Sequence, residues 1–163
     1  MRKPAIAIFL VALALVFTAA PPVVADDESA ATPQQRQVWT KKWGRLGPAY
    51  DLAVRFGWNG RHADAVTLLL ALKRADNPRV LNYLGYNTRK MGRPAEAVFY
   101  YEKAIAIAPD YTLAREYLGE AYLMIGKPDK AKEQLAAIEK LCGTTCGPYK
   151  DLAADIAGYK AGS

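Results

Sequence analysis

Residues 92–110 read GRPAEAVFYYEKAIAIAPD, an apolar segment with helical spacing that begins after a glycine and ends at a proline. Closely related phrases begin at two other glycines: GRHADAV starts at Gly60, and GKPDKAK starts at Gly126. Glycine ends a helix cheaply because it adopts left-handed backbone angles, and proline at a helix start loses no hydrogen bond. The same signals for the start and end of a helix therefore occur three times in the chain, which indicates a repeat protein.

The repeat has a period of 32 to 34 residues. Three kinds of position keep these intervals: Gly60, Gly92 and Gly126; Ala65, Ala97 and Ala131; Leu52, Leu84 and Leu118. Within each period the apolar residues recur with helical spacing, and the alternation typical of a strand is absent from the sequence. Glycine and proline divide the chain into segments of about a dozen residues, a typical helix length. The sequence therefore predicts an all-α fold of paired helices.

Individual residues predict where some of these helices begin and end. Asn77 stands before Pro78, which puts a capping amide next to a proline at the first helical position. Pro109 is expected to end a helix over 95–108, and Asp110 is expected to cap the helix that follows.

Two helices in a period near 34 residues resemble the tetratricopeptide repeat. The resemblance covers residues 46–145 as three units and rests on Leu52, Ala53, Phe56, Gly60, Ala65 and Leu69, then Leu84, Gly85, Gly92, Ala97, Tyr101, Ala104 and Pro109, then Leu118, Gly119, Tyr122, Gly126, Ala131 and Leu135. It implies a short right-handed superhelix of antiparallel helix pairs, a tetratricopeptide-like α-solenoid. Gly85 and Gly119 are expected where paired helices cross, because a large side chain there would push the helices apart. An amphipathic stripe over residues 146–160 predicts a closing helix that caps the array.

The N-terminal residues predict export. Arg2 and Lys3 precede an uncharged apolar run and then small residues, so residues 1–25 have the plan of a secretory signal peptide. We expect cleavage after Ala25, followed by a periplasmic location or secretion. Attachment to a membrane would follow only if the apolar segment stayed uncleaved.

Residues 26–45 are predicted to be a flexible lead-in, because their first ten residues are acidic, small and polar. Within it, Val38, Trp39 and Trp43 are expected to form a short N-terminal cap. Removing two of the 22 basic residues with the signal peptide leaves 20 basic against 16 acidic residues, a balance of +4. These charges are interspersed, whereas a nucleic-acid groove carries a clustered basic stripe, so nucleic acid is not an expected partner.

Cys142 and Cys146 are the only cysteines of the chain. Export would place them in an oxidising compartment, where an even number of cysteines favours a disulfide. Residues four apart in a tight turn lie roughly 6 Å apart between Cα atoms, within the range of a disulfide. We therefore predict a disulfide that fixes the turn before the closing helix. The alternative is a thiol-redox pair, although the spacing differs from that of the thioredoxin motif.

The sequence contains no catalytic constellation. His62 is the only histidine, and with two distant cysteines it makes no zinc set, so a surface role at a helix start is expected. The glycines are spread at repeat intervals and form no phosphate-binding loop. We therefore expect no enzymatic activity, cofactor, metal ion or small-molecule substrate.

In tetratricopeptide arrays the first helix of each pair lines a concave groove that binds peptides or protein segments. The resemblance places these residues in such a groove: Tyr50, Val54, Arg79, Asn82, Tyr86, Arg89, Leu113, Glu116, Glu120 and Leu123. Arg79 and Arg89 suit an acidic segment or a C-terminal carboxylate, and Asn82 suits a peptide backbone. Glu116 and Glu120 suit basic residues further along. The alternative for these residues is a solvated face with intramolecular ion pairs.

Two further tyrosines, Tyr83 and Tyr117, are expected to pack between neighbouring units. The predicted function is a non-enzymatic adaptor of the bacterial cell envelope that binds a protein or peptide segment. A thiol-redox protein and a scaffold that stacks through its repeat ends are the alternatives.

Overall fold

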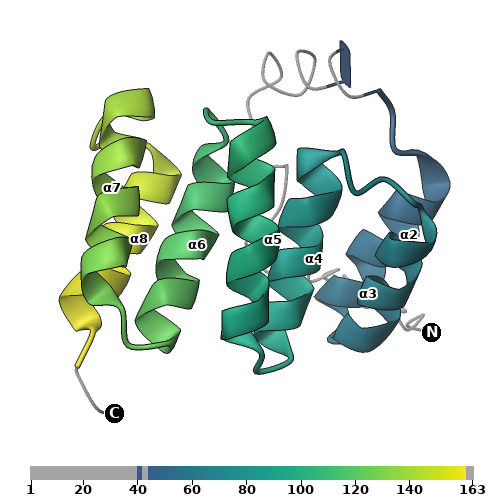
Figure 1. The fold of residues 1–163 in the computed structure, drawn as a ribbon, viewed down its shortest axis with the longest axis horizontal. Coiled ribbons are helices and arrows are strands. Elements are labelled where there is room, and N and C mark those ends of the chain that lie inside the picture. The colour runs from purple at the N-terminus through teal and green to yellow at the C-terminus, as the bar shows by residue number, and fades with distance from the viewer. Residues whose placement is uncertain (1–39, 42–43, 161–163) are drawn as a thin grey trace, which may run out of the picture.

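The structure, a computed structural model, describes residues 40–41 and 44–160. This part of the chain contains seven helices of ten or more residues and no strand, which confirms the all-α prediction (Figure 1). The helices are α2 (Gly47–Trp58), α3 (His62–Ala71), α4 (Pro78–Lys90), α5 (Pro94–Ile107), α6 (Thr112–Met124), α7 (Pro128–Cys142) and α8 (Gly147–Gly158). No helix in these ranges is both long enough and apolar enough to cross a membrane. The predicted signal peptide, and the cap predicted from Val38, Trp39 and Trp43, lie outside the described residues.

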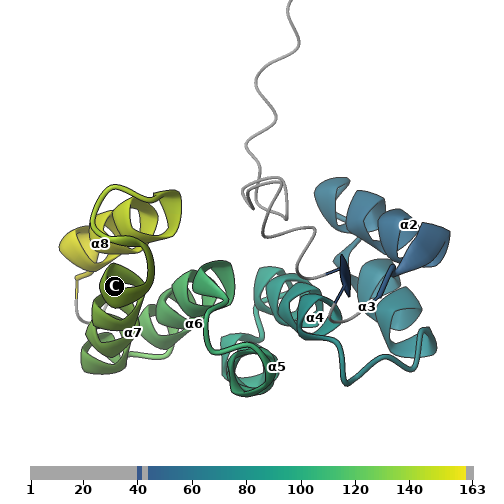
Figure 2. The same ribbon diagram turned by 90° about the horizontal axis from the view of Figure 1, so that it is seen from above.

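The helices form three antiparallel pairs, α2–α3, α4–α5 and α6–α7, followed by α8 (Figure 1). Seen from above, the pairs follow an arc with α2 and α8 at its two ends (Figure 2). Helix α5 lies on the outer side of the arc, and α4 and α6 lie toward its inner side. Three repeat units and a closing helix, as predicted, make up the fold.

The helix ends agree with the local signals except at one position. Asn77 caps α4 as predicted: its side-chain oxygen accepts a hydrogen bond from the Arg79 backbone N–H at 3.0 Å. The turn after α4 depends on Gly92, whose φ of 77° is left-handed. Asp110 does not cap the next helix, because α6 begins only at Thr112, with Tyr111 at the cap position and no side-chain cap bond.

Small residues let the helices approach, and the two glycines meet different partners. A Cβ atom on Gly85 would lie 2.6 Å from a ring carbon of Tyr101, on the paired helix α5. A Cβ atom on Gly119 would lie 2.6 Å from the δ-carbons of Leu152, on the closing helix α8. The expectation for Gly119 was therefore wrong in its partner, since α8, and not the paired α7, takes up the space above this glycine.

Tyrosines fill the space between the units. The Tyr83 hydroxyl on α4 donates a hydrogen bond to the Val54 carbonyl on α2 at 3.1 Å. The Tyr117 ring on α6 has its centroid 5.7 Å from that of Tyr86 and 6.0 Å from that of Tyr101. The prediction that Tyr83 and Tyr117 pack between neighbouring units is confirmed.

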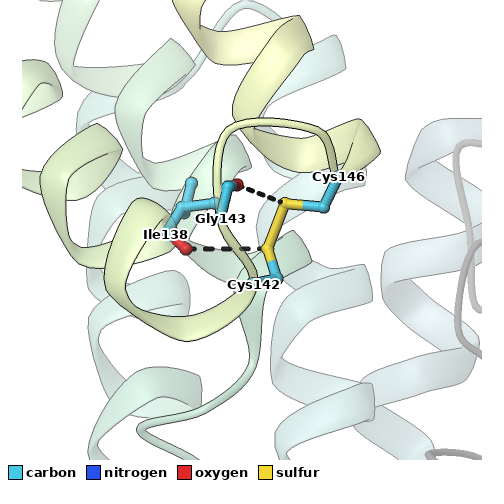
Figure 3. Close-up of a disulfide and its surroundings, with 4 residues drawn as sticks. All are labelled: Ile138, Cys142, Gly143 and Cys146. Carbon is cyan, nitrogen blue, oxygen red and sulfur yellow. Dashed lines mark hydrogen bonds between the residues drawn. A yellow bond between two sulfur atoms is a disulfide. The ribbon is translucent and has the colours of Figure 1, made fainter.

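The closing helix packs through Leu152, whose side chain is fully buried. Cys142 is the last residue of α7, and Cys146 directly precedes α8. Their Cα atoms are 6.0 Å apart, and their sulfur atoms lie together in the turn between the two helices (Figure 3). This placement is the one that the predicted disulfide requires.

Candidate functional site

The ten residues predicted to line a groove are distributed over the first helix of each pair. Tyr50 and Val54 lie on α2; Arg79, Asn82, Tyr86 and Arg89 lie on α4; Leu113, Glu116, Glu120 and Leu123 lie on α6. Eight of the ten are no more than 8% exposed, and only Arg79 and Glu120 are half-buried. The structure thus brings these residues together as a packed tract along the inner helices, and not as a freely solvated face.

An ion pair joins α4 to α6 within this tract. Arg89 pairs with Glu120, and their side chains are only 8% and 20% exposed. Arg89 Nε also donates a hydrogen bond to the Tyr101 hydroxyl at 3.4 Å, and its guanidinium carbon lies 5.3 Å from the centre of the Tyr117 ring. Burial acts to lower the pKa of Arg89, but Tyr101 and Glu120 together raise it above its ordinary value. Glu120 of the same chain therefore competes for Arg89 with the carboxylate that a bound segment was predicted to bring.

Asn82 carries a buried acceptor without a hydrogen-bond partner. Its Nδ2 donates to the Tyr111 hydroxyl at 3.3 Å, whereas its Oδ1 accepts no hydrogen bond, although the residue is only 3% exposed. An unsatisfied buried polar group costs about 1–3 kcal/mol. Such a group in a folded protein calls for an explanation, and a ligand that supplies the missing donor is one.

At the α2 end of the tract, a cleft of about 420 Å³ opens between α2 and the start of α4. We call it the N-terminal cleft; its lining residues are Thr40, Arg45, Leu46, Gly47, Pro48, Tyr50, Asp51 and Arg79. The guanidinium carbon of Arg79 lies 5.3 Å from the centre of the Tyr50 ring, a cation–π contact. With two arginines against one aspartate, the lining of this cleft has a positive balance.

At the other end, a larger cleft of about 810 Å³ opens between α6 and α8. We call it the C-terminal cleft; its lining residues are Glu120, Leu123, Met124, Gly126, Ala154, Asp155, Gly158, Tyr159 and Lys160. Two carboxylates and one ammonium group give its lining a negative balance. Sequence reasoning missed Arg45, Met124 and Asp155 as site residues, because only the packing of distant helices brings them to a cleft.

His62 serves as a link between two repeat units. Its Nδ1 lies 3.0 Å from the Asn87 side-chain oxygen, and its ring stands edge-on to the Tyr86 ring at 6.3 Å between centroids. The residue is half-buried at the start of α3, so it is less exposed than a surface position would be. Over residues 40–41 and 44–160, no three histidine, cysteine, aspartate or glutamate side chains come together as a metal site would require.

Comparison with known proteins supports the same fold. Residues 89–155 match the family model described as tetratricopeptide repeat. No curated protein matches the chain.

Solved structures with a similar fold include those of the type III secretion chaperone SycD and of PcrH. SycD, a translocator chaperone of Yersinia enterocolitica, is similar in an alternative dimer form with 22% identity and a TM-score of 0.61, over 70% of this chain and 87% of that chain. SycD in complex with a peptide of the translocator YopD is similar with 20% identity and a TM-score of 0.59, over 68% of this chain and 86% of that chain. PcrH in complex with the chaperone-binding region of PopB is similar with 20% identity and a TM-score of 0.59, over 71% of this chain and 94% of that chain. At such identities the likeness concerns the fold.

Proposed function

We propose that this chain, whose residues 89–155 match the tetratricopeptide-repeat model, is a non-enzymatic adaptor that holds a segment of a partner protein along α2, α4 and α6. The unsatisfied Asn82 oxygen on α4 is the observation that carries the proposal. Folding has left a buried acceptor without a donor, and the backbone N–H of a bound segment is the donor that a peptide would bring.

The two clefts support a segment that lies along the inner side of the arc. The N-terminal cleft presents Arg45 and Arg79, whereas the C-terminal cleft presents Glu120 and Asp155. A segment with an acidic group at one end and a basic group at the other would match this order of charges, which would also set its direction. SycD and PcrH, which have the same fold, are known in complexes with a translocator peptide and with a chaperone-binding region, so the fold is compatible with binding segments of other proteins.

We further propose that the protein acts in the bacterial cell envelope after loss of residues 1–25, with Cys142 and Cys146 oxidised. The signal-peptide plan of the sequence supports the first part. The 6.0 Å between the two Cα atoms supports the second. Mass spectrometry of the purified mature protein tests both: a chain that begins at Asp26 and takes up alkylating reagent only after reduction is expected, and a full-length chain with free thiols would contradict the proposal.

The binding proposal is tested with immobilised protein and an envelope extract, with mass spectrometry to identify what is retained. Asn82→Leu removes the acceptor and Arg79→Ala removes one of the two cations of the N-terminal cleft, so both should lose the same subset of proteins. Arg93→Ala is the matched control, because Arg93 is an exposed arginine in the turn after α4 that pairs with Glu96. Peptides that tile the identified partner should then bind at least about fivefold more weakly to Asn82→Leu, which corresponds to about 1 kcal/mol. A partner set that is unchanged in both variants would reject the groove.

A further inference from the structure

The C-terminal cleft lies between α6, the last of the three helices expected to form the groove, and the closing helix α8. Ala154 and Gly158, one helical turn apart on α8, contribute little side-chain volume to this wall. Met124 at the end of α6 is 54% exposed, and Tyr159 stands after the end of α8 as a second apolar wall. The lining is therefore a slot with apolar sides and a small-residue face, on the same side of α6 as Glu120.

The two carboxylates that line the slot differ in their ion pairing. Glu120 is already paired with Arg89. Asp155 makes no ion pair with any described residue, although it lines the same cleft. Burial raises the pKa of Asp155; Arg89 acts against this rise, and the nearby Asp151 adds to it. Lys160 is the only cation in the lining, against the two carboxylates of Glu120 and Asp155.

We propose that the C-terminal cleft is a subsite for a lysine or arginine side chain of the bound segment, with α8 as the fourth inner wall of the groove. The proposal rests on the proposed function for the presence of a segment, but the cleft can be probed without one. A lysine or arginine has an aliphatic stem that suits Met124 and Tyr159, and a cationic end that suits Asp155. An acidic side chain would be repelled by the Asp155 carboxylate, which makes no ion pair with a described residue, and a purely apolar one would remove water from Asp155 without replacing its hydration.

The test uses a small probe, Nα-acetyl-L-lysine N-methylamide, titrated into the ¹⁵N-labelled protein. Matched probes carry norleucine, which has a similar stem without the charge, or glutamate. The lysine probe should shift the amide signals of Met124, Ala154 and Gly158 in a saturable way at millimolar concentration, more tightly than either matched probe. Asp155→Asn should weaken the lysine probe by about twofold to fivefold, the range of an exposed charge pair. Asp129→Asn is the control, because Asp129 is 89% exposed at the start of α7 and pairs with Lys132.

Four results would overturn the subsite. The lysine probe could leave these amides unshifted, norleucine could bind as well, glutamate could bind better, or Asp155→Asn could bind lysine unchanged. None of these results depends on a partner protein. A failed probe titration together with loss of the partner in Asn82→Leu would remove the subsite and keep the groove, whereas the opposite pair of results would leave a cation site without an adaptor function.

Discussion

Replacing Glu120 with glutamine tests the ion pair that joins α4 to α6. The change keeps the size of the side chain and removes its charge, so Arg89, whose side chain is 8% exposed, loses its counterion. Breaking a buried pair by removing one partner typically costs 3–5 kcal/mol. Arg89 keeps its hydrogen bond to Tyr101 and its contact with the Tyr117 ring, and Glu120 is 20% exposed. We therefore expect the lower end of that range, a loss of about 3 kcal/mol in the free energy of unfolding.

The assay is urea unfolding followed by the helical circular dichroism signal, with the free energy obtained by linear extrapolation. Arg89→Met should also destabilise, because it leaves Glu120 without its cation. The double variant Arg89→Met/Glu120→Gln should lose less than the sum of the two single changes, because no unpaired charge remains. Glu96→Gln is the control: the Arg93–Glu96 pair is 55% and 39% exposed, and its loss should cost less than about 1 kcal/mol.

A loss below about 0.5 kcal/mol in Glu120→Gln, or strictly additive single changes, would refute this reasoning. Either result would mean that the pair is solvated in the folded protein. Arg89 would then be available to the carboxylate of a partner, as the sequence first suggested.

Three further outcomes are expected. Gly85→Val should destabilise the fold by about 1–3 kcal/mol, because its Cβ would lie 2.6 Å from the fully buried Tyr101 ring; thermal unfolding measures this. Burial is the main cause that raises the pKa values of Tyr101 and Tyr122, so these phenols stay protonated in the folded state while the unfolded chain begins to release their protons near pH 10. The contribution of these phenols to the free energy of unfolding should therefore be constant below that pH and fall above it. Tyr122→Phe should reduce the slope of the free energy of unfolding against pH by up to about 1.4 kcal/mol per pH unit, as urea unfolding between pH 9 and 11 would show. Reduction of Cys142 and Cys146 should cost at most about 2 kcal/mol, because the closed loop is short, and should leave the helical circular dichroism unchanged.

Each of these outcomes has a contrary result. Gly158→Ala is the control for Gly85, because a Cβ there meets nothing within 4 Å, and equal effects of the two changes would contradict the packing argument. A stability that stays constant above pH 10 would show that the two phenols are not shielded. Loss of helix on reduction would show that the turn before α8 supports the whole array.

Much of the fold could be predicted because its signals are local and repeated. A left-handed glycine such as Gly92, or the Asn77–Pro78 pair, acts on the few residues around it, so its effect can be stated without the rest of the molecule. Asp110 shows the limit of such signals, since it stood near enough to cap α6 but one position too early. Its carboxylate was a plausible cap by residue type, and only the backbone path decided which residue reached the cap position.

The features of the candidate site also separate into those that local sequence signals predicted and those that only tertiary packing decided. The sequence by itself determined which helices form pairs and which faces are apolar, because periodic spacing projects residues onto one side of a helix. Tertiary structure alone decided that Arg89 meets Glu120, that the Asn82 oxygen lacks a donor, and that Gly119 faces Leu152. It also decided that α8, predicted only as a cap, brings Asp155 to a cleft with α6. These are contacts between side chains on different helices, and they depend on helix crossing geometry, which one helix's sequence does not specify.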